Sequence, residues 1–305
     1  MANYSTIKGF NIQSLATDPY ASELAAATWS SGNNTNSSLS NRSSAGSATA
    51  NLVAGGTPPT GTAVSETYDG TSWTEGNNLT TGRTGLTGTG TTTAALAMGG
   101  TGVVDINEEY NGTSWSEEAD LNTARSKAGG VGITTAALMV GGDTNDPGVG
   151  GATANVESWN GTSWTEGNNM VVGRQGLFAV GTTTAALAMD GQKDTPPKNT
   201  SSVEDWNGTS WTEVTNTTNI RNGCAGSGIS TLALVFGGDG DTPTVPATEA
   251  WNGTSWTEVA DMGTGRYYLS GSPQGTQGSA LAIDGHDAGA VSNDTEEFGA
   301  ASTVS

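Results

Sequence analysis

The chain has very few of the side chains on which catalytic and metal sites most often depend. Its 305 residues include one cysteine, Cys224, and one histidine, His286. A single cysteine excludes an internal disulfide framework, and a single histidine excludes a zinc centre built from several imidazoles. Any histidine-dependent acyl-transfer triad would need His286, which stands in an Asp-Gly-His-Asp sequence typical of a solvated turn. We therefore expect no catalytic residues, no bound metal and no cofactor.

Basic residues are also scarce. Ten Lys and Arg face thirty Asp and Glu, for a formal net charge of −20. Such a surface repels nucleic acid and anionic membranes, and no basic stripe offsets it. No apolar run approaches the length of a membrane span, and residues 1–5 do not open a signal peptide. We expect no nucleic-acid partner and no membrane insertion.

What the chain does contain is a repeat. The hexapeptide from Tyr68 to Trp73, Tyr-Asp-Gly-Thr-Ser-Trp, returns four times with Asn in place of Asp and, in the last three, Trp in place of Tyr. Its final Trp recurs at 115, 164, 211 and 256. This spacing of about 42 to 49 residues is the period of propeller blades. Each hexapeptide is followed by a Gly-rich stretch and then by an apolar run that ends in Gly-Gly or Asp-Gly.

Each unit is predicted to form four strands. The Gly-rich stretch suits an innermost strand crowded near an axis, and the apolar run suits a second strand covered on both faces. The third strand ends on the first aromatic residue, and the fourth begins on the second. The Asn-Gly or Asp-Gly step between them predicts a tight turn with positive φ at both central residues. The paired aromatics are expected to pack between neighbouring blades.

The two ends of the chain supply complementary parts of one unit. The segment 27–31 around Trp29 matches a fourth strand, whereas residues 279–285 and 296–298 match the second and third strands of a unit without its fourth. We therefore predict an all-β, six-bladed β-propeller of four-stranded blades, which is closed by pairing of the strand near Trp29 with the strand near Phe298. An open solenoid is the alternative. The propeller would span residues 27–305, preceded by an arm at residues 1–26.

All six arginines of the chain follow a fourth strand, and we expect them to share one repeat position and to form a ring: Arg42, Arg83, Arg125, Arg174, Arg221 and Arg266. An acid two residues after the Trp is the expected partner in five units: Glu75, Glu117, Glu166, Glu213 and Glu258. The structural interpretation is a clasp between arginine and glutamate or carbonyl groups that ties the blades together. The functional interpretation is a ring that binds anions or glycan at the mouth of the channel.

The segments between second and third strands vary most between units and are expected on the same face as the arginines. They comprise residues 56–65, 143–153, 192–202 and 239–248. Loops on a rigid scaffold commonly carry binding sites, so Asp143, Asp146, Asp239 and Asp241 are candidate ligand-binding residues. Oxygen ligands of this kind suit calcium, but no spacing matches a defined calcium loop, which favours solvated turns.

The Gly-Gly after the second strand, followed by paired aromatics, resembles kelch repeats over residues 27–298. The Asn-Gly-Thr-Ser-Trp-Thr-Glu and Gly-Thr-Thr-Thr-Ala-Ala-Leu-Ala sequences are similar to proteins of marine bacteriophages, notably cyanophages. The opening residues 7–19 resemble the leader of structural proteins in those phages. This resemblance implies a virion component such as a fibre, neck or head-surface protein. Its arm, through Ile7, Phe10 and Ile12, would contact other virion proteins, and homo-oligomerisation in the particle would be expected.

Two enzyme families with related folds are not matched by the residues. Galactose oxidase, a kelch-like enzyme, needs histidine and tyrosine copper ligands and a Cys–Tyr crosslink, and one histidine does not supply these. The Tyr68–Trp73 hairpin is faintly similar to the Asp-box of sialidases, but the other hairpins carry Asn.

Three functional hypotheses remain. The first is a non-enzymatic virion protein whose propeller face binds a host-surface glycan. The second is a polysaccharide depolymerase that uses paired carboxylates. The third is a structural decoration protein without a ligand.

Overall fold

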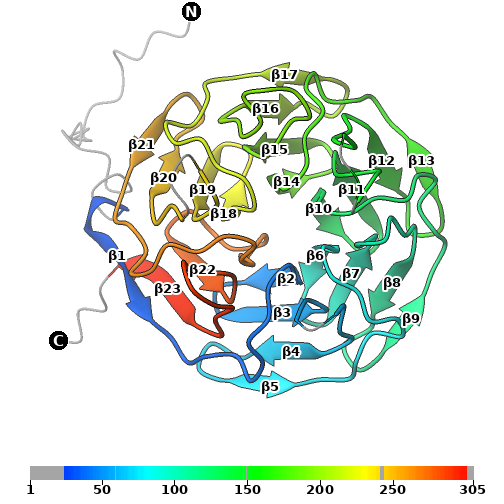
Figure 1. Ribbon diagram of the computed structural model, residues 1–305, viewed down its shortest axis with the longest axis horizontal. Coiled ribbons are helices and arrows are strands. Elements are labelled where there is room, and N and C mark those ends of the chain that lie inside the picture. Colours follow the sequence, from blue (N-terminus) through cyan, green and yellow to red (C-terminus); the bar gives the residue numbers. More distant parts are fainter. Residues whose placement is uncertain (1–23, 59, 147, 149, 241–243, 301–305) are drawn as a thin grey trace, which may run out of the picture.

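The computed structural model describes residues 24–300 except 59, 147, 149 and 241–243. Six antiparallel sheets surround a central axis as the blades of a six-bladed β-propeller, with almost no helix (Figure 1). Within the described residues, no helix has the length and apolar character needed to cross a membrane. Ile7, Phe10 and Ile12, and most of the expected arm at residues 1–26, lie outside the described residues.

Five blades have four strands in chain order from the axis outward. Blade 1 contains β2 (Ser43–Ser47), β3 (Ala50–Ala54), β4 (Ser65–Tyr68) and β5 (Trp73–Glu75). Blade 2 contains β6 (Thr87–Thr91), β7 (Ala94–Met98), β8 (Asn107–Tyr110) and β9 (Trp115–Glu117). Blade 3 contains β10 (Gly129–Ile133), β11 (Ala136–Val140), β12 (Val156–Trp159) and β13 (Trp164–Glu166). Blade 4 contains β14 (Phe178–Thr182), β15 (Ala185–Met189), β16 (Val203–Trp206) and β17 (Trp211–Glu213). Blade 5 contains β18 (Ala225–Ile229), β19 (Leu232–Phe236), β20 (Thr248–Trp251) and β21 (Trp256–Glu258).

Blade 6 joins the two ends of the chain. It contains β22 (Ser279–Ile283), β23 (Thr295–Ala300) and β1 (Ala27–Ser31). The strand β1 pairs with β23 so that Trp29 lies opposite Phe298, which confirms the predicted closure. The innermost position of this blade is irregular, because the segment before β22 joins the sheet through isolated bridges, Ser270 to Ile283 and Thr276 to Ser279, and not through a regular strand.

The hydrophobic core is divided among the six interfaces between neighbouring blades. Each interface holds one cluster of buried side chains, and the cluster between blades 3 and 4, for example, joins Leu138 and Val140 to Trp206 and Trp211. Paired aromatics such as Trp206 and Trp211 stack in a tilted arrangement with centroids 5.3 Å apart. The aromatic pairs therefore pack between blades as the sequence predicts, and each blade depends on its neighbours for burial.

The turn between the two aromatics differs from the predicted one. Tyr68 pairs with Trp73, which leaves a four-residue connection. Only Gly70 in it has positive φ, at 92°. Both the Thr71 and Ser72 N–H groups donate to Asp69 Oδ1, and asparagine does the same in the other hairpins. The prediction of positive φ at both central residues was wrong, because the side chain of Asp or Asn replaces part of the backbone turn.

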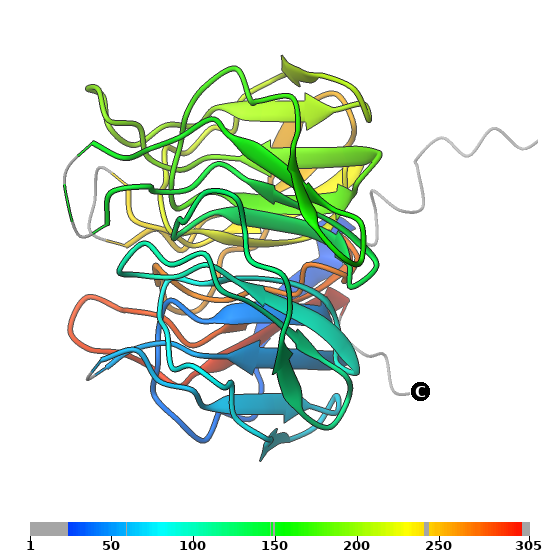
Figure 2. The same cartoon turned by 90° about the vertical axis from the view of Figure 1, so that its right-hand side faces the viewer.

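The two faces of the ring differ in character. On one face, tight hairpins join the first to the second and the third to the fourth strands. On the other, called here the loop face, lie the long connections between second and third strands and the crossovers from one blade to the next (Figure 2). Bridges such as Ser126 to Asp143 and Asn222 to Asp239 hold each crossover beside the long loop of its own blade. The arginines and the variable loops therefore share a face, as expected.

Replacement of Phe298 by alanine tests the closure of the ring. Phe298 is 2% exposed and contacts Trp29 across the two ends of the chain. Removing a buried aromatic ring leaves a cavity, so we expect the free energy of unfolding in urea to fall by about 3–5 kcal/mol. The control Val171→Ala alters a side chain on a residue that is 60% exposed and should change it by less than about 0.5 kcal/mol. Equal effects of the two variants would contradict the pairing.

Candidate functional site: the loop face and the mouth of the channel

The six arginines are buried, at 0–5% exposure, and each forms an ion pair with a buried glutamate of its own blade. The glutamates stand on the third strands, two residues before the first aromatic: Glu66, Glu108, Glu157, Glu204, Glu249 and Glu296. Several arginines also donate to carbonyl groups, as Arg125 does to Asn155 O at 2.9 Å and Arg266 to Asp284 O at 2.8 Å. We call this repeated pair the Arg–Glu clasp.

Each glutamate of the clasp also accepts a hydrogen bond from the crossover that enters its blade. The donor is the backbone N–H seven residues after the Trp of the fourth strand, at 2.6–2.7 Å: Asn36, Thr80, Asn122, Val171, Thr218 and Gly263. For Glu249, burial acts to raise the pKa, but the Thr218 and Asn219 N–H groups and the charge of Arg221 outweigh it and hold the pKa below its ordinary value. The clasp thus fixes the crossover to the blade through a charged carboxylate.

The acids that the sequence suggested as partners are not in the clasp. Glu75, Glu117, Glu166, Glu213 and Glu258 are exposed at the ends of the fourth strands. In blade 3, Glu166 lies opposite Glu157 in the sheet, but only Glu157 reaches the arginine. The prediction failed because the fourth strand is the outermost strand of its blade, where Glu166 is exposed, whereas Glu157 stands on the third strand, further inside the blade, and is buried. The recurrence of Glu two residues before the first aromatic in all six units was the overlooked signal.

Arg42 does not occupy the repeat position that we expected. It follows Trp29 by thirteen residues, whereas Arg83 follows Trp73 by ten. In the first unit the tenth residue is Leu39, buried at 4%. The thirteenth residue of other units is apolar, as at Leu86. Leucine and arginine have therefore exchanged places at the closure, and Arg42 still reaches Glu66 at 3.1 Å.

Two interfaces contain an additional buried carboxylate. Asp190 and Asp284 stand at the ends of second strands, with φ of 58° and 56°, where other blades have glycine. Asp284 accepts from Arg42 of blade 1 at 2.9 Å and from the Thr35 hydroxyl at 2.5 Å. Asp190 is bonded to the Thr217 hydroxyl and lies 3.3 Å from Arg221 Nε of blade 5. Both threonines stand six residues after a Trp, where the interfaces with glycine carry Leu or Met: Leu79, Leu121, Met170 and Met262.

The mouth of the channel on the loop face is a closed ring of backbone hydrogen bonds. One residue of each crossover contributes, and each N–H donates to the carbonyl of the preceding blade at 2.7–2.9 Å. We call these residues the collar: Asn41, Gly85, Lys127, Gly176, Gly223 and Tyr268. All six have positive φ, between 51° and 66°. Because the collar consists of backbone bonds that pass once around the axis, it fixes the diameter of the mouth whatever side chains it carries.

The channel is closed toward the opposite face by the segment 271–277, called here the plug. Gln274 donates through its N–H to Gly46 O at 2.9 Å and through Nε2 to Gly132 O at 3.0 Å, so the plug spans blades 1 and 3. Ser272 N–H donates to Gly226 O of blade 5. Figure 1 shows the orange segment before β22 reaching toward the axis. The plug lies within an inner segment that is two residues longer than the one in blade 5: Ala280 follows Arg266 by 14 residues, whereas Ala233 follows Arg221 by 12.

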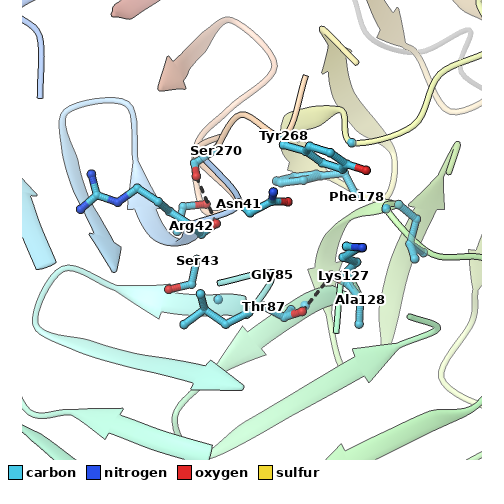
Figure 3. Close-up of a pocket in the computed structure, with 18 of the residues that line it drawn as sticks. Asn41, Arg42, Ser43, Gly85, Thr87, Lys127, Ala128, Phe178, Tyr268 and Ser270 are labelled. Atoms are coloured by element: carbon cyan, nitrogen blue, oxygen red, sulfur yellow. Dashed lines mark hydrogen bonds between the residues drawn. The ribbon is translucent and has the colours of Figure 1, made fainter. Parts of the chain in front are cut away.

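The collar and the inner strands line a pocket of about 90 Å³ (Figure 3), which the plug separates from the opposite face. That volume holds several water molecules. Its wall carries hydroxyl groups that donate to carbonyls, Thr87 to Ala128 O at 2.9 Å and Ser270 to Arg42 O at 3.2 Å. The lone pairs of these hydroxyls remain available as acceptors. Phe178 supplies an aromatic side of the pocket, and the guanidinium of Arg42 points away from it.

An aromatic cluster lies at one side of the mouth. The rings of Tyr267 and Tyr268 are 5.1 Å apart, and Tyr267 stacks on His286 at 5.2 Å with an interplanar angle of 21°. All three are partly exposed. Burial, together with the charge of Asp239 and the neighbouring Tyr268, raises the pKa of Tyr267. Sequence reasoning placed His286 in a solvated turn and did not connect it with the tyrosines, because the contact crosses between separate loops.

The candidate aspartates of the loops fall into different surroundings. Asp146 accepts from Ser126 Oγ at 2.9 Å and pairs with Lys127 at 3.3 Å, which links the loop of blade 3 to the collar. Asp143 caps the N–H of Asn145 within its own loop. Asp239 is partly exposed, burial raises its pKa, and it lies beside Tyr267. Asp241 lies outside the described residues.

Of the predicted ligand-binding residues, Asp146 contacts the collar through Lys127 and Asp239 lies beside Tyr267, whereas Asp143 is buried within its own loop. The arginines are buried in the clasp, where a ligand in solvent does not reach them. Within residues 24–300, apart from the gaps given above, no three His, Cys, Asp or Glu side chains gather closely enough to hold a metal ion. No protein-family model matches the chain, and no curated protein matches it at a significant level. The class of protein is that of the six-bladed β-propellers, defined by the structure itself.

A matched pair of variants tests which acid completes the clasp. Glu157→Gln leaves Arg125 buried without a counter-charge, so we expect the free energy of unfolding to fall by about 3–5 kcal/mol. Glu166→Gln removes an exposed acid from the same hairpin and should change it by less than about 0.5 kcal/mol. Urea unfolding monitored by tryptophan fluorescence measures both. Similar losses in the two variants would restore Glu166 as the partner.

The buried aspartates predict a dependence of stability on pH. Burial raises the pKa of Asp190 to about 7 and that of Asp284 to about 6, against the opposing charges of Arg221 and Arg42, from an ordinary value of 3.8. The folded protein therefore holds these protons more tightly than the unfolded chain. The resulting contribution to stability is fully present below the unfolded pKa and is lost as pH rises through the folded pKa.

The double variant Asp190→Gly/Thr217→Met isolates this effect. It installs the glycine and methionine that the interface of blades 3 and 4 carries at Gly141 and Met170. Between about pH 4 and pH 7 we expect the wild type to lose stability relative to the variant, and above about pH 7 the difference should be constant. Urea unfolding across this range measures it. Parallel curves for the two proteins would show that Asp190 does not titrate in this window.

Proposed function

We propose that the protein is a non-enzymatic component of a virus particle that presents the loop face of its propeller to a carbohydrate on the host surface. Residues 1–26 would attach it to other virion proteins. The observation that carries the binding role is the arrangement of the loop face, where loops of unequal length surround a blind pocket on a rigid ring. A rigid scaffold with variable loops is the common architecture of a binding module.

The particle assignment is supported by the resemblance of residues 7–19 and of the repeat to structural proteins of marine bacteriophages. The six arginines need no catalytic role to explain their recurrence, because each forms an ion pair in an Arg–Glu clasp. The fold alone does not define a function, since propellers host many.

The arrangement of acids does not favour the depolymerase. A glycosidase needs two carboxyl groups that flank one bound sugar. Among the described residues, the glutamates of the clasp and both buried aspartates are bonded to arginine, threonine or backbone groups inside the interfaces. They support the scaffold and do not border the mouth as a pair.

Cryo-electron microscopy of the native particle tests the proposal. We expect density for the propeller projecting from the surface, with its loop face outward and residues 1–26 ordered against another virion protein. In parallel, purified protein added to host cells should compete with particle adsorption. Absence of the chain from purified particles, together with unchanged adsorption, would overturn the proposal.

A further inference from the structure

The collar is symmetric in its backbone and asymmetric in its side chains. Gly85, Gly176 and Gly223 adopt the left-handed backbone conformation without cost. Lys127 and Tyr268 adopt the same conformation with φ of 52° and 51°, although a bulky side chain is unfavourable there. Three of the six units have glycine at this position and form the same collar. The backbone conformation of the collar therefore does not require a tyrosine here. Strain of this kind is typical of binding and catalytic positions.

The neighbouring glycine accommodates the ring of Tyr268. A Cβ atom at Gly223 would lie 2.6 Å from Cδ1 and 2.9 Å from Cε1 of Tyr268. The ring therefore lies over the adjacent blade, across the edge of the mouth (Figure 3). Tyr268 is partly exposed, and the centroid of the Tyr267 ring lies 5.1 Å from its own. The result is a partly exposed aromatic surface beside the opening of the pocket.

Hydrogen-bond donors and acceptors surround the ring of Tyr268. Asn41 lies beside Tyr268 in the collar, donating its own N–H to the Tyr268 carbonyl. Its side-chain amide makes no hydrogen bond within the described part of the chain, is partly exposed and lines the pocket. Lys127 stands across the mouth, and its charge is compensated by Asp146. The mouth therefore offers one aromatic face, an amide and hydroxyl acceptors, with no uncompensated positive charge among its side chains.

We propose that the mouth of the channel is a binding site for one neutral sugar unit of a glycan, with Tyr268 as the platform under the sugar ring. The apolar face of a pyranose, with its C–H groups, packs on an aromatic ring, while its hydroxyls need donors and acceptors at the edge. Asn41 and the pocket hydroxyls supply both, and a protein of net charge −20 repels acidic saccharides at long range. This inference rests on the proposed function and assigns its ligand class and position.

Substitution of Tyr268 by residues that the collar already contains provides the test. Tyr268→Gly and Tyr268→Asn introduce the residues found at Gly223 and Asn41, so the collar should form and the melting temperature should stay equal or rise. Binding is measured by titration calorimetry with neutral oligosaccharides of glucose, galactose and mannose, and with acidic oligogalacturonates. We expect the wild type to bind at least one neutral oligosaccharide, and both variants to bind it roughly tenfold more weakly or not at all.

Ile229→Thr is the matched control on the opposite face. Ile229 is 52% exposed, and the equivalent residues of blades 2 and 4 are Thr91 and Thr182. This variant should bind as the wild type does. Unchanged affinity in both Tyr268 variants, or a wild type that binds only oligogalacturonates or no saccharide, would overturn the inference. Those outcomes are distinguishable from failure of the proposed function, which is decided by the presence of the chain on the particle.

Discussion

The buried pair of arginine and glutamate is the interaction on which the rest of the structure depends. Each blade buries its sides only against its neighbours, so the connection between blades has to be held in one geometry. The glutamate fixes the entering crossover through a backbone N–H, while the arginine joins it to the carbonyls of the long loop. A buried ion pair of this kind adds little net free energy to folding, but any arrangement that leaves one of its two charges buried without a partner is strongly unfavourable. It therefore selects one position for each crossover, and the collar follows from six such positions.

Departures from the repeat lie where the ring closes, where the channel opens, and between blades 4 and 5, where Asp190 replaces a glycine. At the closure, Leu39 and Arg42 exchange their roles, and Asp284 adds a second carboxylate to the same guanidinium. At the opening, Tyr268 stands where three other blades have glycine. Because the blades repeat one pattern, equivalent positions in the ring are equivalent in structure. A residue that departs from the pattern in one blade, such as Tyr268, therefore provides a side chain that no other blade has at that position. Function is expected at such exceptions, because the scaffold does not need them.

The fold was predictable because the same sequence pattern occurs once in each blade. Paired aromatics at a period typical of blades, and complementary half-units at the ends, led to the pairing of Trp29 with Phe298. The site was less predictable. The wrong glutamates were chosen for the clasp because the count from the Trp led to the fourth strand, which is the exposed outer edge of each blade. The contact of Tyr267 with His286 joins two loops with no shared pattern, and the plug arises from only two additional residues.

The sequence by itself determined the number of blades, their strand order and the way the ring closes, because these follow from local periodicity and from the need to satisfy strand edges. Only the tertiary structure decided which acid each arginine meets, that the channel is blind, and that a strained tyrosine stands at its mouth. These features depend on the direction of side chains around an axis shared by six blades. No single repeat contains the contacts between separate strands and loops that set those directions.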